Sequence, residues 1–535
     1  MTFFRISRKP VATAAAVVAL ALLTFFQFPG HTWLQQDSQI YAPVLEHLRD
    51  DSVLRNDMLA QQSQVAYTLY DETALGLRRV TGLSFRAVLA LEQVTARALG
   101  IWGLYLMAAA MGLAAGPALA VAGICSLGAL IAGPQVLTIE YEPTPRAFAV
   151  PLVMCALGLA AHRRYRDAGI AAAIAFLYHA PTALPFWGLF AALAIARRRW
   201  WGLAPLAAAM GILWLAARIQ GGAAAEQPFF AALAPSDEQI QRMRAAYVWI
   251  SSWPPLLVVH WIVLLVIFLA AWARLRREMP VELRLLLLGL SILGVAAMPA
   301  SGLLLERWRW ALIPQLQPMR TLLFVALGMQ FLTAVAGVRA AVRGRPAEAM
   351  AWLAMAYLLP LQAVITGPFV GSRIALAAAL AAFTAVVVWS RPRFAPLAAV
   401  VAFFAIPTLG GVVNYPRLHT PELAQLSEWA RSNTPQDAVF IFPDAGRALS
   451  PGVFRSAALR AVYVDWKGGG QVNYLRGFGE RWWFRWQQTM ARGFRAADLA
   501  KYDGLGIGYV VLQPANRLDR VAAFENSRYL VYRVR

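Results

Sequence analysis

Long apolar runs alternate with short polar segments along most of the chain, and the runs lack the polar face of a helix in a soluble protein. Each run is close to the length of a helix that crosses a bilayer. The pattern predicts about 13 transmembrane helices. They lie near residues 11–28, 99–115, 118–134, 147–161, 168–180, 181–196, 201–217, 254–273, 283–303, 321–338, 348–367, 374–390 and 394–412.

Clusters of arginine follow the predicted helices that end near residues 161, 196, 273, 338 and 390. Loops rich in arginine and lysine favour the cytoplasmic side of a membrane. If the N-terminus is cytoplasmic, every one of these clusters falls on that side. The predicted helix at 168–180 is short, and its loss would invert all later loops. The pattern places four parts of the chain outside the cytoplasm: residues 31–86, 138–146 and 218–253, and everything after residue 412.

The composition changes after residue 412. Short runs rich in β-forming residues, at 438–442, 461–466, 509–512 and 529–534, alternate with predicted helices at 421–432 and 481–497. This alternation is typical of a small α/β domain. We therefore predict a polytopic α-helical membrane domain over residues 1–412, with an outer loop at 31–86. A C-terminal extracytoplasmic α/β domain follows over residues 413–535.

Composition agrees with the membrane prediction, because 59% of the residues are hydrophobic and only 14% are charged. The formal net charge of +21 comes almost entirely from arginine, and the lysines are Lys9, Lys467 and Lys501. The arginines lie between apolar runs, which indicates membrane topology and not nucleic-acid binding. Cys125 and Cys155 lie inside apolar runs and indicate neither a disulfide nor a metal site.

The first outer loop is rich in carboxylates for such a basic protein: Asp37, Glu46, Asp50, Asp51 and Asp57 all lie within residues 31–57. Asp37 follows the first predicted helix closely and so lies near the lipid headgroups. A carboxylate there can act as a general base on a hydroxyl group, or bind a divalent cation. The alternative is a solvated loop residue. We adopt that alternative for Asp50 and Asp51, and keep both interpretations for Asp37.

Architecture and short motifs together resemble the GT-C superfamily of membrane glycosyltransferases. Residues 37–42, DSQIYA, resemble the Asp-Glu-x-x-Tyr-Ala motif of the branch that transfers aminoarabinose and mannose, with Asp37 and Tyr41 matching. The resemblance implies a polyprenyl-phosphate-linked sugar as donor, a catalytic Asp37, substrate binding by Tyr41, and a divalent cation at Asp37. Ser38 replaces the usual second carboxylate, and Asp57 is the candidate to supply it.

A lipid-linked phosphate needs a cation at headgroup depth, and arginine binds phosphate through two parallel hydrogen bonds. Arg146 and Arg320 begin predicted helices on the outer side and are the candidates. Glu142 lies beside Arg146, and His179 ends the short helix at 168–180. We assign these four residues to substrate binding. The alternatives are interfacial anchoring for the arginines, pairing with Arg146 for Glu142, and helix capping for His179.

These observations predict sugar transfer from a polyprenyl-phosphate carrier to a lipid, glycan or protein acceptor on the outer face of the bacterial inner membrane. Two other functions stay open. One is a transporter or flippase of a lipid-linked substrate, and the other is a non-catalytic envelope-assembly protein with the same fold.

Overall fold

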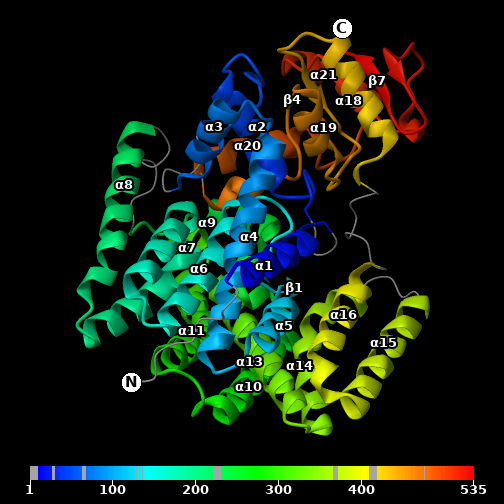
Figure 1. Ribbon diagram of the computed structural model, residues 1–535. Helices are drawn as coiled ribbons and strands as arrows, with labels where there is room; N and C mark the ends of the chain where they lie inside the picture. The colour runs from blue at the N-terminus through cyan, green and yellow to red at the C-terminus, as the bar shows by residue number, and fades with distance from the viewer. Residues whose placement is uncertain are drawn as a thin grey trace.

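The computed structural model describes residues 10–26, 31–62, 68–126, 130–131, 133–134, 136–220, 230–365, 371–408, 418–474 and 476–534. A bundle of helices forms one part, and a smaller unit that contains a sheet caps one end of it (Figure 1). The bundle helices are α1 (Pro10–Phe26), α4 (Phe85–Ala110), α5 (Ala115–Cys125), α6 (Pro145–Ala161), α7 (Tyr165–Ala196), α8 (Ala204–Gln220), α10 (Pro255–Leu275), α11 (Val281–Ser301), α13 (Leu323–Val342), α14 (Pro346–Ile365), α15 (Gly371–Ser390) and α16 (Ala395–Thr408).

Four helical stretches of the described residues are long and apolar enough to cross a membrane: Tyr165–Ala196, Pro255–Leu275, Val281–Arg307 and Ile313–Val342. Most other bundle helices coincide with predicted runs, but α4 begins at Phe85, well before the predicted run at 99–115. The run at 118–134 does not form one helix. That run is helical only to Cys125 and then forms a hairpin of β1 (Leu130–Ile131) and β2 (Val136–Leu137). Gly133, at φ 97°, and Pro134 form the turn, which is incompatible with a continuous helix.

Helix α7 is folded back on itself at His179, whose backbone is extended (φ −157°, ψ 88°). The indole Nε1 of Trp187 donates to the carbonyl oxygen of Ala172 at 3.1 Å, although 15 residues separate them. Arg163 and Arg197, just outside the two ends, both lie within 4 Å of the Glu282 carboxylate. A straight helix would hold these ends about 48 Å apart. The two short predicted helices at 168–180 and 181–196 therefore form an antiparallel pair.

The arginine clusters meet at one end of the bundle. The carboxylate of Glu278 binds Arg274, Arg339 and Arg343, and Glu348 binds Arg274 and Arg345. Together with the pairs of Glu282, these contacts join the clusters that follow α6, α7, α10 and α13.

The C-terminal unit contains a five-stranded sheet with the order β4-β3-β5-β7-β6. Strand β3 is parallel to both β4 and β5, and β7 is antiparallel to β5 and β6. Its strands are β3 (Val439–Ile441), β4 (Ala461–Val462), β5 (Tyr509–Leu512), β6 (Phe524–Glu525) and β7 (Leu530–Arg533), and its helices are α18 (Pro421–Asn433), α19 (Ser450–Ala458), α20 (Arg476–Thr489) and α21 (Leu499–Gly504). Strands and helices alternate as far as β5, as the sequence predicts, whereas β5, β6 and β7 follow one another without an α-helix between them.

The segment that follows α1 packs into the C-terminal unit. It contains α2 (Ser38–Arg49), which lies between the bundle and α19, and α3 (Tyr70–Thr81) (Figure 1). Ile40 and Leu59 are buried in one hydrophobic cluster with residues of β5 and β7, and Leu34 and Ala42 are buried in a second. Short α9 (Pro235–Arg244) joins the first cluster through Ile240. The core of the C-terminal unit therefore includes residues more than 350 positions earlier in the chain.

Candidate active site

Asp37 lies at the N-terminus of α2, where an aspartate carboxylate commonly caps the first turn of its own helix. Here Glu142, from the loop before α6, performs that role. Its carboxylate accepts from the backbone N–H groups of Gln36 at 2.8 Å and Asp37 at 2.7 Å, and from the Ser38 hydroxyl. The carboxylate of Asp37 is therefore not used to cap the helix. Glu142 is buried and its oxygens are occupied by the protein, so we infer a structural role for it.

Two cations contact the carboxylate of Asp37. The Lys467 Nζ lies 2.5 Å from Oδ1, and an Arg146 guanidinium nitrogen lies 3.9 Å from Oδ2. Arg146 is the second residue of α6 and is held by Glu140, whose Oε1 accepts from its Nε at 2.5 Å. The Asp37 side chain remains 39% exposed, whereas those of Arg146 and Lys467 are only 12% and 10% exposed. A ligand can thus approach a carboxylate whose counter-ions are fixed.

These charges set the ionisation of the two carboxyl groups. Burial raises the pKa of Asp37, but Lys467 and Arg146 outweigh it and hold that pKa well below the usual range. Burial and the negative charge of Asp37 raise the pKa of Glu142. Opposite charges within about 4–6 Å favour the ionised form of a carboxyl group, and like charges disfavour it. The pKa of Asp37 is therefore shifted in the opposite direction to that of Glu142, so Asp37 ionises more readily than Glu142.

Tyr41 lies one turn after Asp37 on α2. Its ring centroid is 5.1 Å from that of Tyr70, and the Tyr70 ring stacks on Phe148 of α6 at 5.8 Å. Burial and the nearby Asp37 carboxylate raise the pKa of Tyr41, so its hydroxyl keeps its proton. This side chain thus offers an O–H donor beside the carboxylate.

A cavity beside this cluster contains the remaining two predicted substrate-binding residues. Its walls include His179 and Thr182 from the bend of α7, Gln317 and Arg320 from the segment before α13, and Tyr474 of the C-terminal unit. The space between atoms is about 290 Å³, including the part open to solvent. The Gln317 backbone is left-handed (φ 48°), a conformation that costs a residue other than glycine energy, and Gln317 Nε2 donates to the Tyr474 hydroxyl at 2.9 Å.

Two buried polar atoms of this cavity have no protein partner among the described residues, Gln317 Oε1 and Arg320 Nε. The Arg320 guanidinium lies 5.5 Å from the ring centroid of Tyr247. His179, by contrast, is engaged, because its Nδ1 lies 2.9 Å from the Thr182 hydroxyl. Buried polar atoms without partners are rare in proteins, and these suit the hydroxyl and phosphate oxygens of a ligand.

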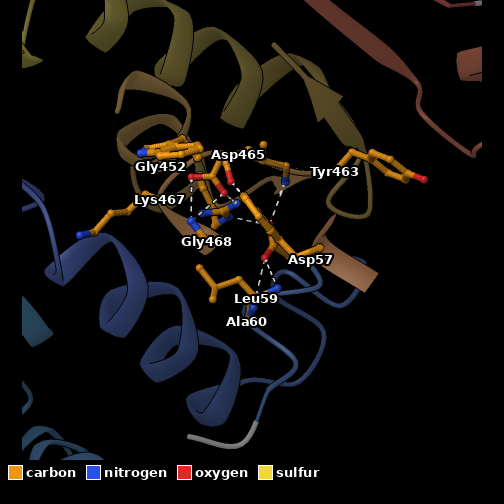
Figure 2. Close-up of polar contacts among 12 residues, drawn as sticks. Asp57, Leu59, Ala60, Gly452, Tyr463, Asp465, Lys467 and Gly468 are labelled. Atoms are coloured by element: carbon orange, nitrogen blue, oxygen red, sulfur yellow. Dashed lines mark hydrogen bonds and ion pairs between the residues drawn. The ribbon is translucent and has the colours of Figure 1, made fainter. Parts of the chain in front are cut away.

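Asp57 does not join the Asp37 cluster. Its buried carboxylate accepts from the backbone N–H groups of Leu59 at 2.9 Å, Ala60 at 3.1 Å and Val462 at 2.9 Å, and from the Arg455 Nε at 2.7 Å (Figure 2). The same guanidinium donates to Asp465 at 2.5 Å. Four donors leave Asp57 no capacity for a substrate. The expectation that Asp57 supplies a second catalytic carboxylate is therefore not supported, and we assign it a structural role.

Sequence reasoning missed three residues of this site, Lys467, Tyr474 and Gln317. The first two come from the C-terminal unit, so their proximity to Asp37 depends on tertiary structure. One signal for Lys467 was present, because arginine supplies nearly every other positive charge of the chain.

The resemblance implied a divalent cation at Asp37. The described residues contain no group of three or more His, Cys, Asp or Glu side chains that fits a metal ion. Two positive side chains already contact the carboxylate of Asp37, and Glu142 is bonded to backbone N–H groups. A hard cation requires several free oxygen ligands. The residues around Asp37 therefore do not fit a divalent cation.

Residues 421–488 match a family described as a domain of unknown function (DUF6798). No curated protein matches the chain. The structure is similar to that of ArnT from Cupriavidus metallidurans in the apo state, with a TM-score of 0.52 at 13% identity over 98% of this chain and 97% of ArnT. For ArnT bound to undecaprenyl phosphate the TM-score is 0.50 at 12% identity, over 99% and 98% of the two chains.

A third similar structure is the arabinofuranosyltransferase AftD from Mycobacteria, with a TM-score of 0.43 at 16% identity over 95% of this chain and 35% of AftD. The match to ArnT runs over nearly the whole length of both chains, so it includes the bundle and the C-terminal unit together. ArnT is a GT-C glycosyltransferase. The chain therefore has the GT-C fold.

Proposed function

We propose that this protein transfers a sugar from a polyprenyl-phosphate carrier to a hydroxyl group of an acceptor, at the end of the bundle capped by the C-terminal unit. The observation that carries the proposal is the approachable Asp37 carboxylate with Arg146 and Lys467 at its oxygens, next to a cavity with unpaired polar atoms. The likeness to ArnT, which is solved with undecaprenyl phosphate, supports the choice of donor.

The arrangement supplies the two functions that this reaction requires. The acceptor oxygen attacks the anomeric carbon of the sugar, the bond from that carbon to the phosphate oxygen breaks, and polyprenyl phosphate leaves. Asp37 takes the proton of the attacking hydroxyl as general base. Arg146 and Arg320 stabilise the negative charge that develops on the leaving phosphate. Tyr41 and the polar atoms of the cavity orient the substrate.

Deleting the gene tests this function in cells. We expect the deletion strain to lose one envelope glycan and to accumulate the corresponding polyprenyl-phosphate sugar, as measured by mass spectrometry of extracted lipids and glycans. The wild-type gene should reverse both changes. Loss of the glycan without accumulation of a lipid-linked sugar would contradict the proposal and favour a role in assembly.

The same proposal places the capped end outside the cytoplasm. The arginines that meet at Glu278, Glu282 and Glu348 mark the opposite end, and such residues are enriched on the cytoplasmic side. The N-terminus is then cytoplasmic, the bundle spans the inner membrane, and the C-terminal unit is extracytoplasmic.

Single cysteines test this topology. In a background with Cys125→Ala and Cys155→Ala, we expect a membrane-impermeant maleimide to label Asp50→Cys in intact cells but neither Arg166→Cys nor Arg199→Cys. All three should react after permeabilisation. Arg166 lies in the first turn of α7 and Arg199 follows its last residue, so the fold of α7 at His179 puts both at the same side. Labelling of one of them but not the other in intact cells would show that α7 crosses the membrane once.

Chelation tests the metal expectation. Because protein cations already surround Asp37, we expect sugar transfer by the purified protein to continue at an unchanged rate in EDTA and after dialysis against it. The measurement is the initial rate of product formation with and without added Mg²⁺, Mn²⁺ or Ca²⁺. Loss of transfer in EDTA with recovery on adding one of these ions would contradict the expectation.

A further inference from the structure

Lys467 brings a positive charge of the C-terminal unit to the candidate active site. Its Nζ lies 2.5 Å from Asp37 Oδ1, although 430 residues separate the two. The carbonyl oxygens of Trp466 and Lys467 accept from the guanidinium of Arg244, at the end of α9, at 3.0 and 3.5 Å. Three distant parts of the chain thus place one ammonium group beside the carboxylate.

The turn that carries Lys467 is held rigidly. The Asp465 carboxylate accepts from Arg455 at 2.5 Å and from the Gly468 N–H at 3.3 Å, and the Asp465 carbonyl accepts from the Trp482 indole at 2.8 Å. At Gly469 a Cβ would lie 2.4 Å from the Trp482 ring, so the backbone packs directly against the indole. Figure 2 shows Lys467 extending away from Asp57 and Asp465. The network therefore fixes the backbone and leaves the ammonium group to face Asp37.

We propose that Lys467 binds the phosphate of the lipid-linked donor while remaining close to Asp37, so that the C-terminal unit completes the active site. This inference rests on the proposed function. An ammonium group has three N–H donors, and among the described residues the one side-chain oxygen bonded to that of Lys467 belongs to Asp37. Lysine also serves as a point charge for phosphate in other proteins. The remaining donors can therefore contact a phosphate oxygen without breaking the ion pair.

The charges of the reaction explain why one cation serves both groups. The donor phosphate is a diester with one negative charge, and the leaving polyprenyl phosphate is a monoester that gains a second. Asp37 becomes neutral when it takes the proton of the acceptor hydroxyl. One unit of negative charge thus moves from the carboxylate to the phosphate. An ammonium group between the two keeps a negative partner throughout, and its interaction with the phosphate strengthens as the bond to the sugar breaks.

Direct binding of undecaprenyl phosphate, compared with undecaprenol, tests the inference. With the purified full-length protein in detergent we expect wild type to prefer the phosphorylated lipid, and Lys467→Gln to bind it about 10- to 100-fold more weakly, as for a lost hydrogen bond between charged groups. Lys467→Arg should bind within about threefold of wild type, because it retains the charge. Lys501→Gln is the matched control, since Lys501 is exposed and its Nζ contacts only the Gln488 carbonyl among the described residues.

A double variant separates phosphate binding from neutralisation of Asp37. In the Asp37→Asn variant, position 37 has no charge for Lys467 to neutralise. Adding Lys467→Gln then leaves neither partner of this ion pair charged, so the second change should not destabilise the fold. We expect this second change still to weaken binding of undecaprenyl phosphate. Equal binding by Asp37→Asn and by the double variant would show that Lys467 only neutralises Asp37, and would overturn the inference.

The pH dependence of transfer supplies another readout. Lys467 lowers the pKa of Asp37, so the acid limb of kcat/KM should move to higher pH in Lys467→Gln. An unmoved limb with unchanged lipid binding would overturn the inference and leave the proposed function intact. If wild type binds undecaprenyl phosphate no more tightly than undecaprenol, the proposed function itself fails.

Discussion

Replacing Asp37 by asparagine lowers the rate of sugar transfer by about 10²- to 10⁴-fold, the effect of removing a positioned general base. The change is nearly isosteric, and Glu142 rather than Asp37 caps the helix, so α2 keeps its first turn. Asparagine does not repel phosphate, so binding of the lipid donor should stay as tight as in wild type or become tighter. The loss then falls on kcat and not on KM. Initial rates at saturating donor measure it.

The matched control for Asp37 is Asp50→Asn. Asp50 belongs to the same acidic segment, but it is only partly buried and its carboxylate accepts only from the hydroxyl and N–H of Ser52 among the described residues. Transfer by Asp50→Asn should equal that of wild type. A wild-type rate for Asp37→Asn would refute the assignment of the base, and an equal loss in both variants would point to a general effect of charge in this segment.

Features carried by local sequence could be predicted. The arginine clusters indicated that the chain reverses between 168–180 and 181–196, although each helix is short, and the contacts of Arg163 and Arg197 with Glu282 agree. The match of Asp37 and Tyr41 to a family motif pointed to the N-terminus of α2, where Arg146 and Lys467 contact Asp37. Both inferences rest on sequence patterns within one segment, and tertiary packing did not change the local structure that these patterns predict.

Features that depend on distant partners could not be predicted. Asp57 was a candidate because it lies in an acidic segment, but the role of a carboxylate is decided by its donors, and Arg455 is 398 residues away. Glu142 was expected to bind substrate or to pair with Arg146, whereas Glu140 pairs with Arg146 and Glu142 caps α2. Ser38, which replaces an expected carboxylate, donates its hydroxyl to Glu142, so a carboxylate does lie beside Asp37.

The buried network at Arg455 leads to a second large expected effect. The side chains of Arg455, Asp57 and Asp465 are at most 2% exposed, and one guanidinium serves both carboxylates. Arg455→Leu would leave two buried carboxylates without their cation. Removing one partner of a buried ion pair typically costs about 3–5 kcal/mol of folding free energy. We expect thermal unfolding in detergent to occur at a markedly lower temperature than in wild type.

The control for this effect is Arg517→Leu in the same unit. Arg517 pairs with Glu525, but the two side chains are 55% and 49% exposed, so the loss of this pair should leave the unfolding temperature close to that of wild type. An unfolding temperature of Arg455→Leu equal to that of Arg517→Leu would contradict the expected effect.

The same network decides between the two roles of Asp57. Asp57 bonds the first outer segment to Arg455 and to the N–H of Val462 in β4, and Arg455 bonds Asp465 on the turn that carries Lys467. If Asp57 is structural, Asp57→Asn should lower the unfolding temperature and the affinity for undecaprenyl phosphate together, because the turn loses its support. If Asp57 were catalytic, transfer would fall while stability and binding stayed at wild-type values. Because all four donors to Asp57 come from the protein itself, we expect stability and lipid affinity to fall together.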